Sequence, residues 1–356
     1  MSEDNHLDLG AQLFAAAGRA RAPDLRCLVV GAGLLGSHVA RELADCGYEV
    51  AVFTRGVNPW FTSERQEDIA VNFGEIEAER ELLSELIKEA DCVVHLASSS
   101  RPPMAAHAPA LDLARTVVPA LTVAEMVARH GDEKLLVTSS SGGTVYGTPL
   151  VLPTPETHPL QPTTPYAISH VALEHYLLHF QRHFRLRSAT CRFGNVYGPG
   201  ELGRGGQGVI GTWLREVALG EQPIALGDLD VARDFVYVDD AARAVRAIIE
   251  NSCCGPYNIA SSSATSLREL LGIVRDVIGI AIHPIAAPAG VQHATAEIRR
   301  TCLDITRIRE HVGWTPAVTL PEGIRLTWDW LRTEWLFEAA QTSGELADRE
   351  PGMAGS

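Results

Sequence analysis

The sequence predicts an α/β fold, a doubly wound parallel sheet with a smaller C-terminal α/β region for substrate binding. Three observations predict it: short apolar runs alternate with helical stretches, a glycine turn follows the first run, and the regular alternation ends after residue 199. Short apolar runs of this kind are typical of parallel strands that are covered on both faces. The 356 residues, 46% of them hydrophobic, supply a core for one large unit or two closely associated domains.

The expected elements follow in chain order. Residues 1–24 form an Ala-rich, partly charged N-terminal extension. Strands are then expected at 26–30, 49–53, 69–73, 91–96 and 134–138, and a later helix at 266–278. The polar, turn-rich tail, residues 336–356, is expected to be disordered.

This pattern divides the chain into two parts. Residues 25–196 are expected to form the dinucleotide-binding domain, which also receives strand and helix segments from about 233–262. The Gly- and Pro-rich segments that break the regularity, 197–232 and 263–335, are expected to form the substrate-binding region, because loops on a rigid scaffold carry specificity.

Composition excludes several classes of protein. The formal net charge of -14 argues against a nucleic-acid-binding surface. The seven cysteines lack paired C-x-x-C spacings, so neither a zinc site nor a disulfide framework is expected. The N-terminus lacks the basic start and apolar run of a signal peptide, and no stretch reaches membrane-spanning length. We therefore expect a soluble, cytoplasmic protein without a metal or a membrane partner.

A glycine-rich turn directly follows the first expected strand. Val29-Val-Gly-Ala-Gly-Leu-Leu-Gly36 places G-x-G-x-x-G between a strand and a helix. Gly31 and Gly33 permit a tight turn and close approach of a pyrophosphate, and Gly36 lets helix and strand pack. The helix N-terminus adds amide donors. The turn predicts a Rossmann-type dinucleotide site, with a glycine turn that binds nothing as the alternative.

The end of the second expected strand bears on the choice between NAD and NADP. Thr54 and Arg55 stand where an acidic residue would hold the adenosine ribose diol. Arg55 suits a 2'-phosphate, or is a solvated loop charge. The choice between NAD and NADP is therefore open at this position: NAD is expected, and NADP is the alternative that Thr54 and Arg55 raise.

Tyr166 and His170 are the most informative pair, because a spacing of four residues places both on one helix face. A phenol is a poor base at its ordinary pKa of about 10, and a cation one turn away brings that pKa toward neutrality. The usual cation is lysine, whereas histidine holds its proton only weakly at neutral pH. The pair predicts proton transfer with Tyr166 as base. His170 is then an imidazolium, a neutral hydrogen-bonding ring, or a surface histidine without function.

Four further motifs accompany the glycine turn and the tyrosine. They are His95-Leu-Ala-Ser98, Ser139-Ser-Ser-Gly-Gly-Thr-Val-Tyr-Gly147, Arg192-Phe-Gly-Asn-Val-Tyr-Gly-Pro199 and Arg233-Asp-Phe-Val-Tyr-Val-Asp-Asp240. With all six motifs, the chain resembles the extended short-chain dehydrogenase/reductases over about residues 25–335. It is most similar to the nucleotide-sugar epimerases and dehydratases of the UDP-glucose 4-epimerase type.

The resemblance implies that a nicotinamide cofactor oxidises a sugar carbon while Tyr166 removes the hydroxyl proton. The implied cofactor contacts are Gly31, Gly33, Leu34, Leu35, Gly36, Thr54, Arg55, Glu75, Ile76, Leu96, Ala97, Ser98, Ser139, Tyr166, His170 and Phe193. The implied substrate contacts are Ser141, Thr144, Tyr166, Asn195, Val209, Arg233, Arg299 and Arg300. The alternatives are an ion pair of Arg233 with Asp234 or Asp239, and a turn role for Asn195.

Two departures from the family pattern affect the chemistry. Gly142 replaces the usual catalytic serine or threonine, and His170 replaces the lysine. Ser141 or Thr144 offers a substitute hydroxyl, and the sequence favours Thr144 narrowly; alternatively, both only satisfy backbone groups. Gly143-Thr144 stands where the family's 4,6-dehydratases carry Asp-Glu and its decarboxylases a glutamate, and the cysteine of the 3,5-epimerases is also missing.

A nucleotide-sugar 4-epimerase is therefore the first hypothesis, with catalytic residues Tyr166, His170, Thr144 and Ser141. The alternatives are an NAD(P)-dependent nucleotide-sugar dehydrogenase or reductase, and a non-catalytic cofactor- or sugar-nucleotide-binding protein. The resemblance also implies a homodimer formed through two helices of each copy.

Overall fold

The computed structural model describes residues 25–335, apart from 99, 132, 204–207, 222–223, 226–227, 281–284 and 287–297. The side chains of 224–225 and 285–286 are also not described. The expected N-terminal extension and C-terminal tail lie outside the described residues.

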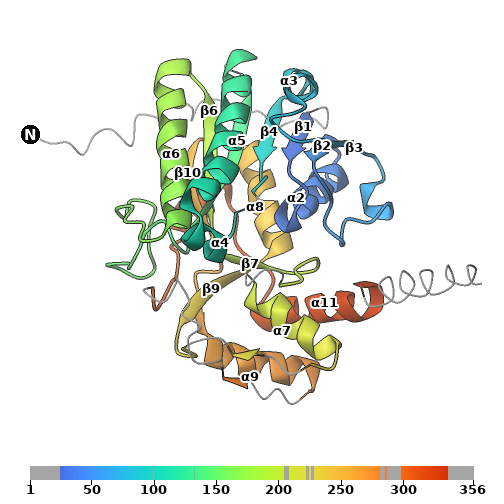
Figure 1. Ribbon diagram of the computed structural model, residues 1–356, viewed down its shortest axis with the longest axis vertical. Helices are drawn as coiled ribbons and strands as arrows, with labels where there is room; N and C mark the ends of the chain where they lie inside the picture. Colours follow the sequence, from blue (N-terminus) through green and yellow to red (C-terminus); the bar gives the residue numbers. More distant parts are fainter. Residues whose placement is uncertain are drawn as a thin grey trace, which may run out of the picture.

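A parallel seven-stranded sheet forms the centre of the larger part (Figure 1). Its strand order, β10-β6-β5-β4-β1-β2-β3, proceeds outward from β1 in both directions, so the predicted doubly wound fold is confirmed. The five expected strands are β1 to β5, with end points that differ by at most three residues. The strands are β1 (Arg26–Val30), β2 (Glu49–Thr54), β3 (Ile69–Phe73), β4 (Cys92–His95), β5 (Leu135–Ser141), β6 (Arg187–Phe193) and β10 (Gly255–Ile259).

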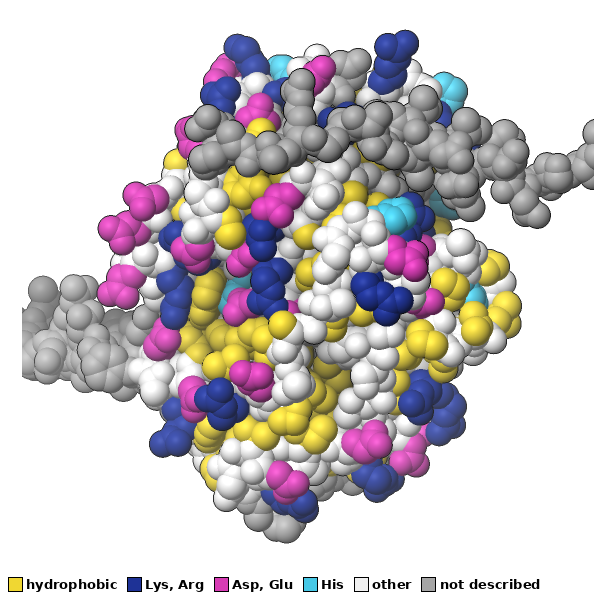
Figure 2. Space-filling model, turned by 180° about the vertical axis from the view of Figure 1, so that it is seen from behind, with side chains coloured by type: hydrophobic (Ala, Val, Ile, Leu, Met, Phe, Trp, Pro, Cys, Tyr) yellow, Lys and Arg dark blue, Asp and Glu magenta, His cyan; other side chains and the backbone are white. Residues whose placement is uncertain are grey.

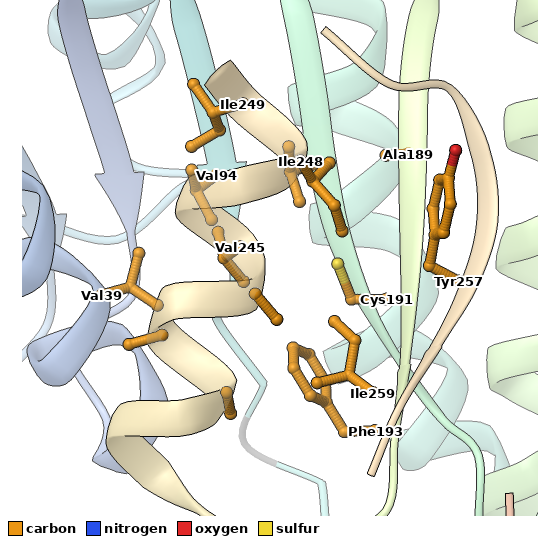
Figure 3. Close-up of a cluster of buried hydrophobic side chains, with 14 of the residues drawn as sticks. Val39, Val94, Ala189, Cys191, Phe193, Val245, Ile248, Ile249, Tyr257 and Ile259 are labelled. Atoms are coloured by element: carbon orange, nitrogen blue, oxygen red, sulfur yellow. The ribbon is translucent and has the colours of Figure 1, made fainter. Parts of the chain in front are cut away.

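Helices cover both faces of this sheet, which explains the continuous apolar strands. Cys27 and Val29 pack toward α2 and α8, whereas Leu28 and Val30 pack toward α3, α5 and α6. Figure 3 shows α8 lying against the sheet, with Val245 and Ile248 on the side of the helix that faces the strands. The helices are α2 (Leu34–Asp45), α3 (Arg80–Glu89), α4 (Pro102–His107), α5 (Pro109–Arg129), α6 (Pro165–Phe184), α8 (Val238–Glu250) and α10 (Thr306–Val312), with a 3-10 turn, η1 (Glu64–Gln66).

The smaller part has its own core beside the carboxyl ends of the large sheet (Figure 1). A three-stranded sheet in the order β11-β9-β7 packs with helices around Trp213, Tyr237 and Trp328. The elements are β7 (Asn195–Tyr197), α7 (Val209–Ala218), β8 (Ile224–Ala225), β9 (Ala232–Tyr237), β11 (Ala264–Ser266), α9 (Leu267–Ile278), β12 (Ile285–Ala286), α11 (Leu320–Trp330) and a π-helical stretch, η2 (Leu331–Trp335). The division into a cofactor part and a substrate part stays a prediction.

Side chains from the segment after β2 connect the two parts. The Asn58 amide donates to the Gly200 carbonyl at 3.1 Å, and Arg65 forms an ion pair with Glu334 at 2.8 Å. The Arg65 guanidinium also lies 4.7 Å from the centre of the Trp60 ring. These contacts fix the smaller part against the larger one.

The surface carries charges of both signs. Figure 2 shows basic and acidic side chains interspersed over one face, with hydrophobic side chains gathered around its centre. Among the described residues, no helix is both long enough and apolar enough to span a bilayer, and no His, Cys, Asp and Glu side chains group as metal ligands.

Candidate functional site

Steric constraints determine the shape of the glycine turn between β1 and α2. Gly31 has φ +102°, and a Cβ there would lie 2.6 Å from the Ala97 backbone. A Cβ at Gly36 would overlap the Gly31 carbonyl oxygen, whereas one at Gly33 would meet no atom within 4 Å. The first and third glycines are therefore needed for packing, and the second borders open space in front of the α2 N-terminus. The first helical residues, Leu34 and Leu35, present amide N–H groups in that direction.

Thr54 and Arg55 lie beside this turn at the end of β2. The Thr54 hydroxyl accepts from the Ala32 amide at 3.2 Å and donates to the Gly56 carbonyl at 2.7 Å, so it braces the glycine turn. Arg55 is exposed, and its guanidinium lies 3.9 Å from the Glu75 carboxylate. Glu75 is also exposed, whereas its neighbour Ile76 packs against the core.

The segment after β4 completes this edge. The Leu96 amide donates to the Val30 carbonyl at 2.9 Å, and the next residue, Ala97, contacts Gly31. Ser98 is exposed, with its hydroxyl 3.4 Å from the Ser100 amide. The carboxyl ends of β1, β2 and β4 thus bring their predicted cofactor residues to one edge of the sheet, where ligands bind in open α/β folds.

Tyr166 and His170 occupy the first turns of α6. The helix starts at Pro165, after Thr164, whose side chain accepts from the Ala167 amide at 3.3 Å as an N-cap. The two rings meet edge to face, with centroids 4.6 Å apart. His170 is 5% exposed, which excludes a surface histidine.

His170 is buried without a hydrogen-bond partner. Neither imidazole nitrogen is bonded within the described part of the chain. Burial lowers the pKa of His170 to about 4, although the carboxylates of Glu174 and Asp112 both oppose this change. His170 is therefore a neutral ring at physiological pH, with two nitrogens free to bind a ligand.

The phenol of Tyr166 is held in its protonated form. Burial is the main cause that raises its pKa to about 12, and the Asp112 carboxylate raises it further. A hydrogen bond with the Ser141 hydroxyl lowers it. Ser141, at the end of β5, is therefore the hydroxyl that reaches Tyr166.

The turn after β5 explains the loss of the usual serine. A Cβ at Gly142 would lie 2.5 Å from Leu303 Cδ1 and 2.8 Å from the Arg192 carbonyl oxygen, so the position has no room for a side chain. Thr144 donates to the Ser141 hydroxyl at 2.8 Å. The geometry thus reverses the narrow preference for Thr144: Ser141 faces the phenol, and Thr144 orients Ser141. Ser139 lies two residues earlier on β5, partly buried.

Asn195 and Arg233 lie on paired strands of the smaller sheet. Asn195 is exposed on β7, and a Cβ at Gly143 would lie 3.5 Å from its side-chain oxygen, so it borders the same turn. Arg233 is partly buried on β9 and donates to the carbonyls of Ala232 and Ile298 at 2.9 and 3.0 Å. Among the described residues it has no carboxylate partner. Burial alone lowers the pKa of Arg233, because a buried guanidinium is less stable in its charged form.

The acidic neighbours of Arg233 have other partners. Asp234 accepts from Ser261 and from the Leu303 amide, and Asp239 lies 2.5 Å from His38. The alternative of an ion pair with either is therefore excluded within the described residues. Of the other predicted contacts, Phe193 is buried at the end of β6 and Val209 begins α7. Arg299 is bound by Asp228 at 2.7 Å, and Arg300 is exposed beside it.

Sequence reasoning missed two buried residues near the site. Asp112 lies on α5, and its carboxylate acts to raise the pKa values of both Tyr166 and His170. His38, two residues after Gly36, bonds to Asp239 and to the Pro199 carbonyl. The available signal was a polar residue within an apolar helical run, as in Leu111-Asp-Leu113.

Comparisons with known proteins agree with this geometry. The sequence model described as NAD dependent epimerase/dehydratase family matches residues 27–260. A UDP-glucose 4-epimerase of Mycolicibacterium smegmatis is 34% identical over 245 residues, 68% of this chain and 77% of that protein.

Solved structures share the fold. The Thermus thermophilus UDP-glucose 4-epimerase complex with NAD has a TM-score of 0.77 at 31% identity, over 87% of this chain and 100% of that one. The Thermotoga maritima UDP-glucose 4-epimerase with UDP-glucose has a TM-score of 0.78 at 30% identity, with the same coverage. The relatives also include a UDP-glucuronic acid decarboxylase of Arabidopsis thaliana, 27% identical over 84% of this chain and 68% of that protein. A GDP-6-deoxy-D-mannose reductase of Pseudomonas aeruginosa is 29% identical over 67% of this chain and 80% of that protein.

Proposed function

Because the chain belongs to the NAD-dependent epimerase/dehydratase family, we propose that it is a nucleotide-sugar 4-epimerase that acts by transient hydride transfer to bound NAD. One observation carries the proposal: Tyr166, paired with the Ser141 hydroxyl, lies on the helix that follows β5, at the same sheet edge as the glycine turn. This arrangement suits proton transfer beside a nicotinamide.

The described residues fit a dinucleotide. The open side of Gly33, in front of the α2 amides, suits a pyrophosphate. The two unbonded, buried nitrogens of His170 suit the ribose hydroxyls next to a nicotinamide. The Arg55 guanidinium lies 3.9 Å from the Glu75 carboxylate. This negative charge would repel a 2'-phosphate, which favours NAD over NADP.

Each residue then has a role in the reaction. Hydride acceptance and return is the chemistry that a bound nicotinamide supplies. As the phenolate, which the positive charge of a bound oxidised nicotinamide would favour, Tyr166 takes the proton of the sugar hydroxyl and later returns it, and Ser141 hydrogen-bonds the same oxygen. Arg233, without a carboxylate partner in the described part, binds the diphosphate, and Asn195 contacts the substrate beside Gly143.

The turn after β5 favours epimerisation over the other reactions of the family. Gly143 and Thr144 offer no carboxyl group to expel water, and Thr144 already donates to Ser141. A dehydratase or a decarboxylase is therefore disfavoured, as the sequence also predicted. A 4-epimerase or a reductase remains.

Purified protein with NAD and a panel of UDP- and dTDP-sugars tests the proposal. We expect C4 epimers of at least one sugar, detected by chromatography or NMR. Oxidation of NADH or NADPH by a keto-sugar without any epimer would instead favour the reductase. Turnover that appears only after His170→Lys would establish a non-catalytic binding protein and overturn the proposal.

We also propose a homodimer, with α5 and α6 as the contact. These helices lie side by side at the edge of the molecule in Figure 1. Tyr176 is 50% and Phe184 54% exposed, and both line an apolar groove with Leu121 and Phe180. Exposed aromatic patches are typical of interfaces. Light scattering on the wild type and on Phe184→Glu, which we expect to be monomeric, tests this contact. The cytoplasmic location stays a prediction.

A further inference from the structure

A row of buried polar side chains crosses the large sheet beside the helix that carries Tyr166. Ser140 on β5, Arg192 on β6 and Asn258 on β10 are register partners on neighbouring strands. Because side chains alternate between the two faces of a sheet, register partners lie on the same face. All three residues are buried, and we call them the polar row.

Glu174 covers the polar row from α6. It lies one helical turn after His170. Its carboxylate accepts from the Ser140 hydroxyl at 2.6 Å, and from Nη2 and Nε of Arg192 at 2.6 and 3.1 Å. The side chains of Arg192 and Glu174 are 5% and 10% exposed, so the ion pair is almost fully removed from water. The helix of the candidate catalytic pair is therefore bound to β5 and β6.

The remaining arm of the Arg192 guanidinium reaches the turn after β5. Nη1 donates to the Tyr146 hydroxyl at 2.9 Å and to the Glu156 carbonyl at 3.2 Å. The Tyr146 hydroxyl in turn donates to Asn258 Oδ1 at 2.7 Å. Ser141 lies at the start of the same turn. Arg192 thus joins two elements of the site, α6 and the turn after β5.

Stability alone does not explain an ion pair at this place. Desolvation of two buried charges offsets most of their attraction, so apolar side chains of similar volume are often equally stable. The arginine fork differs from an apolar side chain because its N–H donors have fixed directions. The pair between Arg192 and Glu174 is therefore better suited to orienting the elements that it joins.

We propose that Arg192 is a positioning residue of the Tyr166 site: it fixes α6 through Glu174 and the turn after β5 through Tyr146. It thereby sets the distance and the angle at which the phenol meets the sugar hydroxyl. The kinetic meaning of this inference rests on the proposed function. A displacement of about 1 Å at a reacting group can lower a rate by about 100-fold, so such an anchor has a measurable effect.

Other side-chain bonds of α6 lie elsewhere. Gln181 donates to the carbonyl and the hydroxyl of Ser188 at 3.0 and 2.9 Å, but near the opposite end of the helix from Tyr166. Ser169 bonds to Asp112, which belongs to α5 and not to the sheet. Arg192, in contrast, bonds to both elements of the site at once.

Two variants of the full-length protein test the proposal. Tyr146→Phe removes the hydroxyl that links Arg192 to the turn. Arg192→Lys keeps the positive charge but cannot bond Glu174 and Tyr146 through one rigid fork. Tyr257→Phe is the matched control, because Tyr257 is a buried tyrosine of the same hydrophobic cluster and loses a hydroxyl bond of 2.9 Å to His311.

Fluorine NMR of protein made with a fluorinated tyrosine reports on the phenol without any need for activity. The Tyr166 resonance is assigned by its loss in Tyr166→Phe. We expect it to shift in Tyr146→Phe and in Arg192→Lys, and to keep its position in Tyr257→Phe. An unshifted resonance in Tyr146→Phe, or an equal shift in the control, would overturn the proposal. If Arg192→Lys does not fold, Tyr146→Phe and its control decide alone.

Kinetics give the second measurement. In Tyr146→Phe, kcat should fall about 10-fold while KM for the sugar stays within about twofold, because a misplaced phenol weakens the transition state more than substrate binding. A purely structural role would lower the melting temperature in Tyr146→Phe and Tyr257→Phe alike and leave kcat unchanged in both. A shifted Tyr166 resonance in a protein that epimerises no sugar would refute only the proposed function. Epimerisation with an unchanged kcat in Tyr146→Phe would refute only the role of Arg192.

Discussion

Two helices that begin at the same edge of the sheet each carry a buried histidine in their early turns. His38 on α2 is fully bonded: Nδ1 lies 2.5 Å from Asp239, Nε2 lies 2.9 Å from the Pro199 carbonyl, and the ring stacks on Trp60. His170 on α6 bonds to nothing in the described part. The bonds of His38 connect separate parts of the fold, whereas we propose that the unbonded nitrogens of His170 bind the cofactor.

This difference shows that the hydrogen bonds of a buried histidine can distinguish a structural role from a binding role. The partners of His38 come from the loop after β7 and from α8, so its ring couples the helix of the glycine turn to the smaller part. The unbonded nitrogens of His170 cost stability, since buried polar groups without partners are unfavourable. Such a cost is typical of binding sites.

The largest expected effect is on chemistry at the α6 turn. Tyr166→Phe should lower the epimerisation rate by about 100-fold or more, because it removes the acid–base group. Tyr176→Phe, on the same helix but half exposed, is the matched control and should keep activity. Initial rates of C4 epimer formation measure both. Near-wild-type rates in Tyr166→Phe would show that Tyr166 is not the acid–base group.

The two histidines should respond in opposite ways to the same substitution. His38→Leu should lower the free energy of unfolding by about 2 kcal/mol, because it leaves the Pro199 carbonyl without its donor and removes the ring that stacks on Trp60. His170→Leu should change it little or raise it by about 1 kcal/mol, because it removes two unbonded nitrogens. Urea unfolding measures both. Calorimetric titration should show weaker NAD binding in His170→Leu. Equal losses of stability would show that the two rings have the same structural role.

The glycines of the α2 turn allow a second test that separates an effect on stability from an effect on binding. Gly36→Ala should destabilise the protein by about 2 kcal/mol, since its Cβ would overlap the Gly31 carbonyl. Gly33→Ala has open space and should leave the melting temperature within a few degrees while it weakens NAD binding. Thermal melts with and without NAD distinguish the two. A large destabilisation by Gly33→Ala would contradict the open side of the turn.

The last expected effect is on the pH dependence of stability. Burial lowers the pKa of His170 to about 4 from its ordinary value of 6.5, so the unfolded chain binds a proton more readily than the folded one. This contribution to stability is complete above pH 6.5 and is lost as the pH falls toward 4. Between about pH 7 and pH 5, His170→Leu should therefore lose about 2 kcal/mol less than the wild type. Urea midpoints at the two pH values measure this, and parallel losses would refute a buried, neutral ring.

The fold was predictable because its signals are local. Apolar runs indicated β1 to β5, and the glycine spacing between a strand and a helix predicted the turn that Gly31 and Gly36 form. The spacing of Tyr166 and His170 likewise predicted their shared helix face. Such patterns depend on neighbours within a few residues.

The chemistry of the site was less predictable because it depends on distant neighbours. The protonation of His170 depends on its burial, and the choice of Ser141 over Thr144 depends on the position of α6. Asp112 lies 54 residues before Tyr166 in the chain, and no local pattern connects the two. Packing of α5 against α6 brings them together.

The crowding at Gly142 limits the substitutions that this turn can accept. Backbone oxygens of Arg192 and Phe193, 2.8 and 3.0 Å from a Cβ there, would remain even if Leu303 became smaller. No single replacement can therefore restore a hydroxyl at 142 while β6 keeps its place. We propose that Ser141 hydrogen-bonds the sugar oxygen, and we therefore expect that its loss cannot be repaired by a hydroxyl at its neighbour.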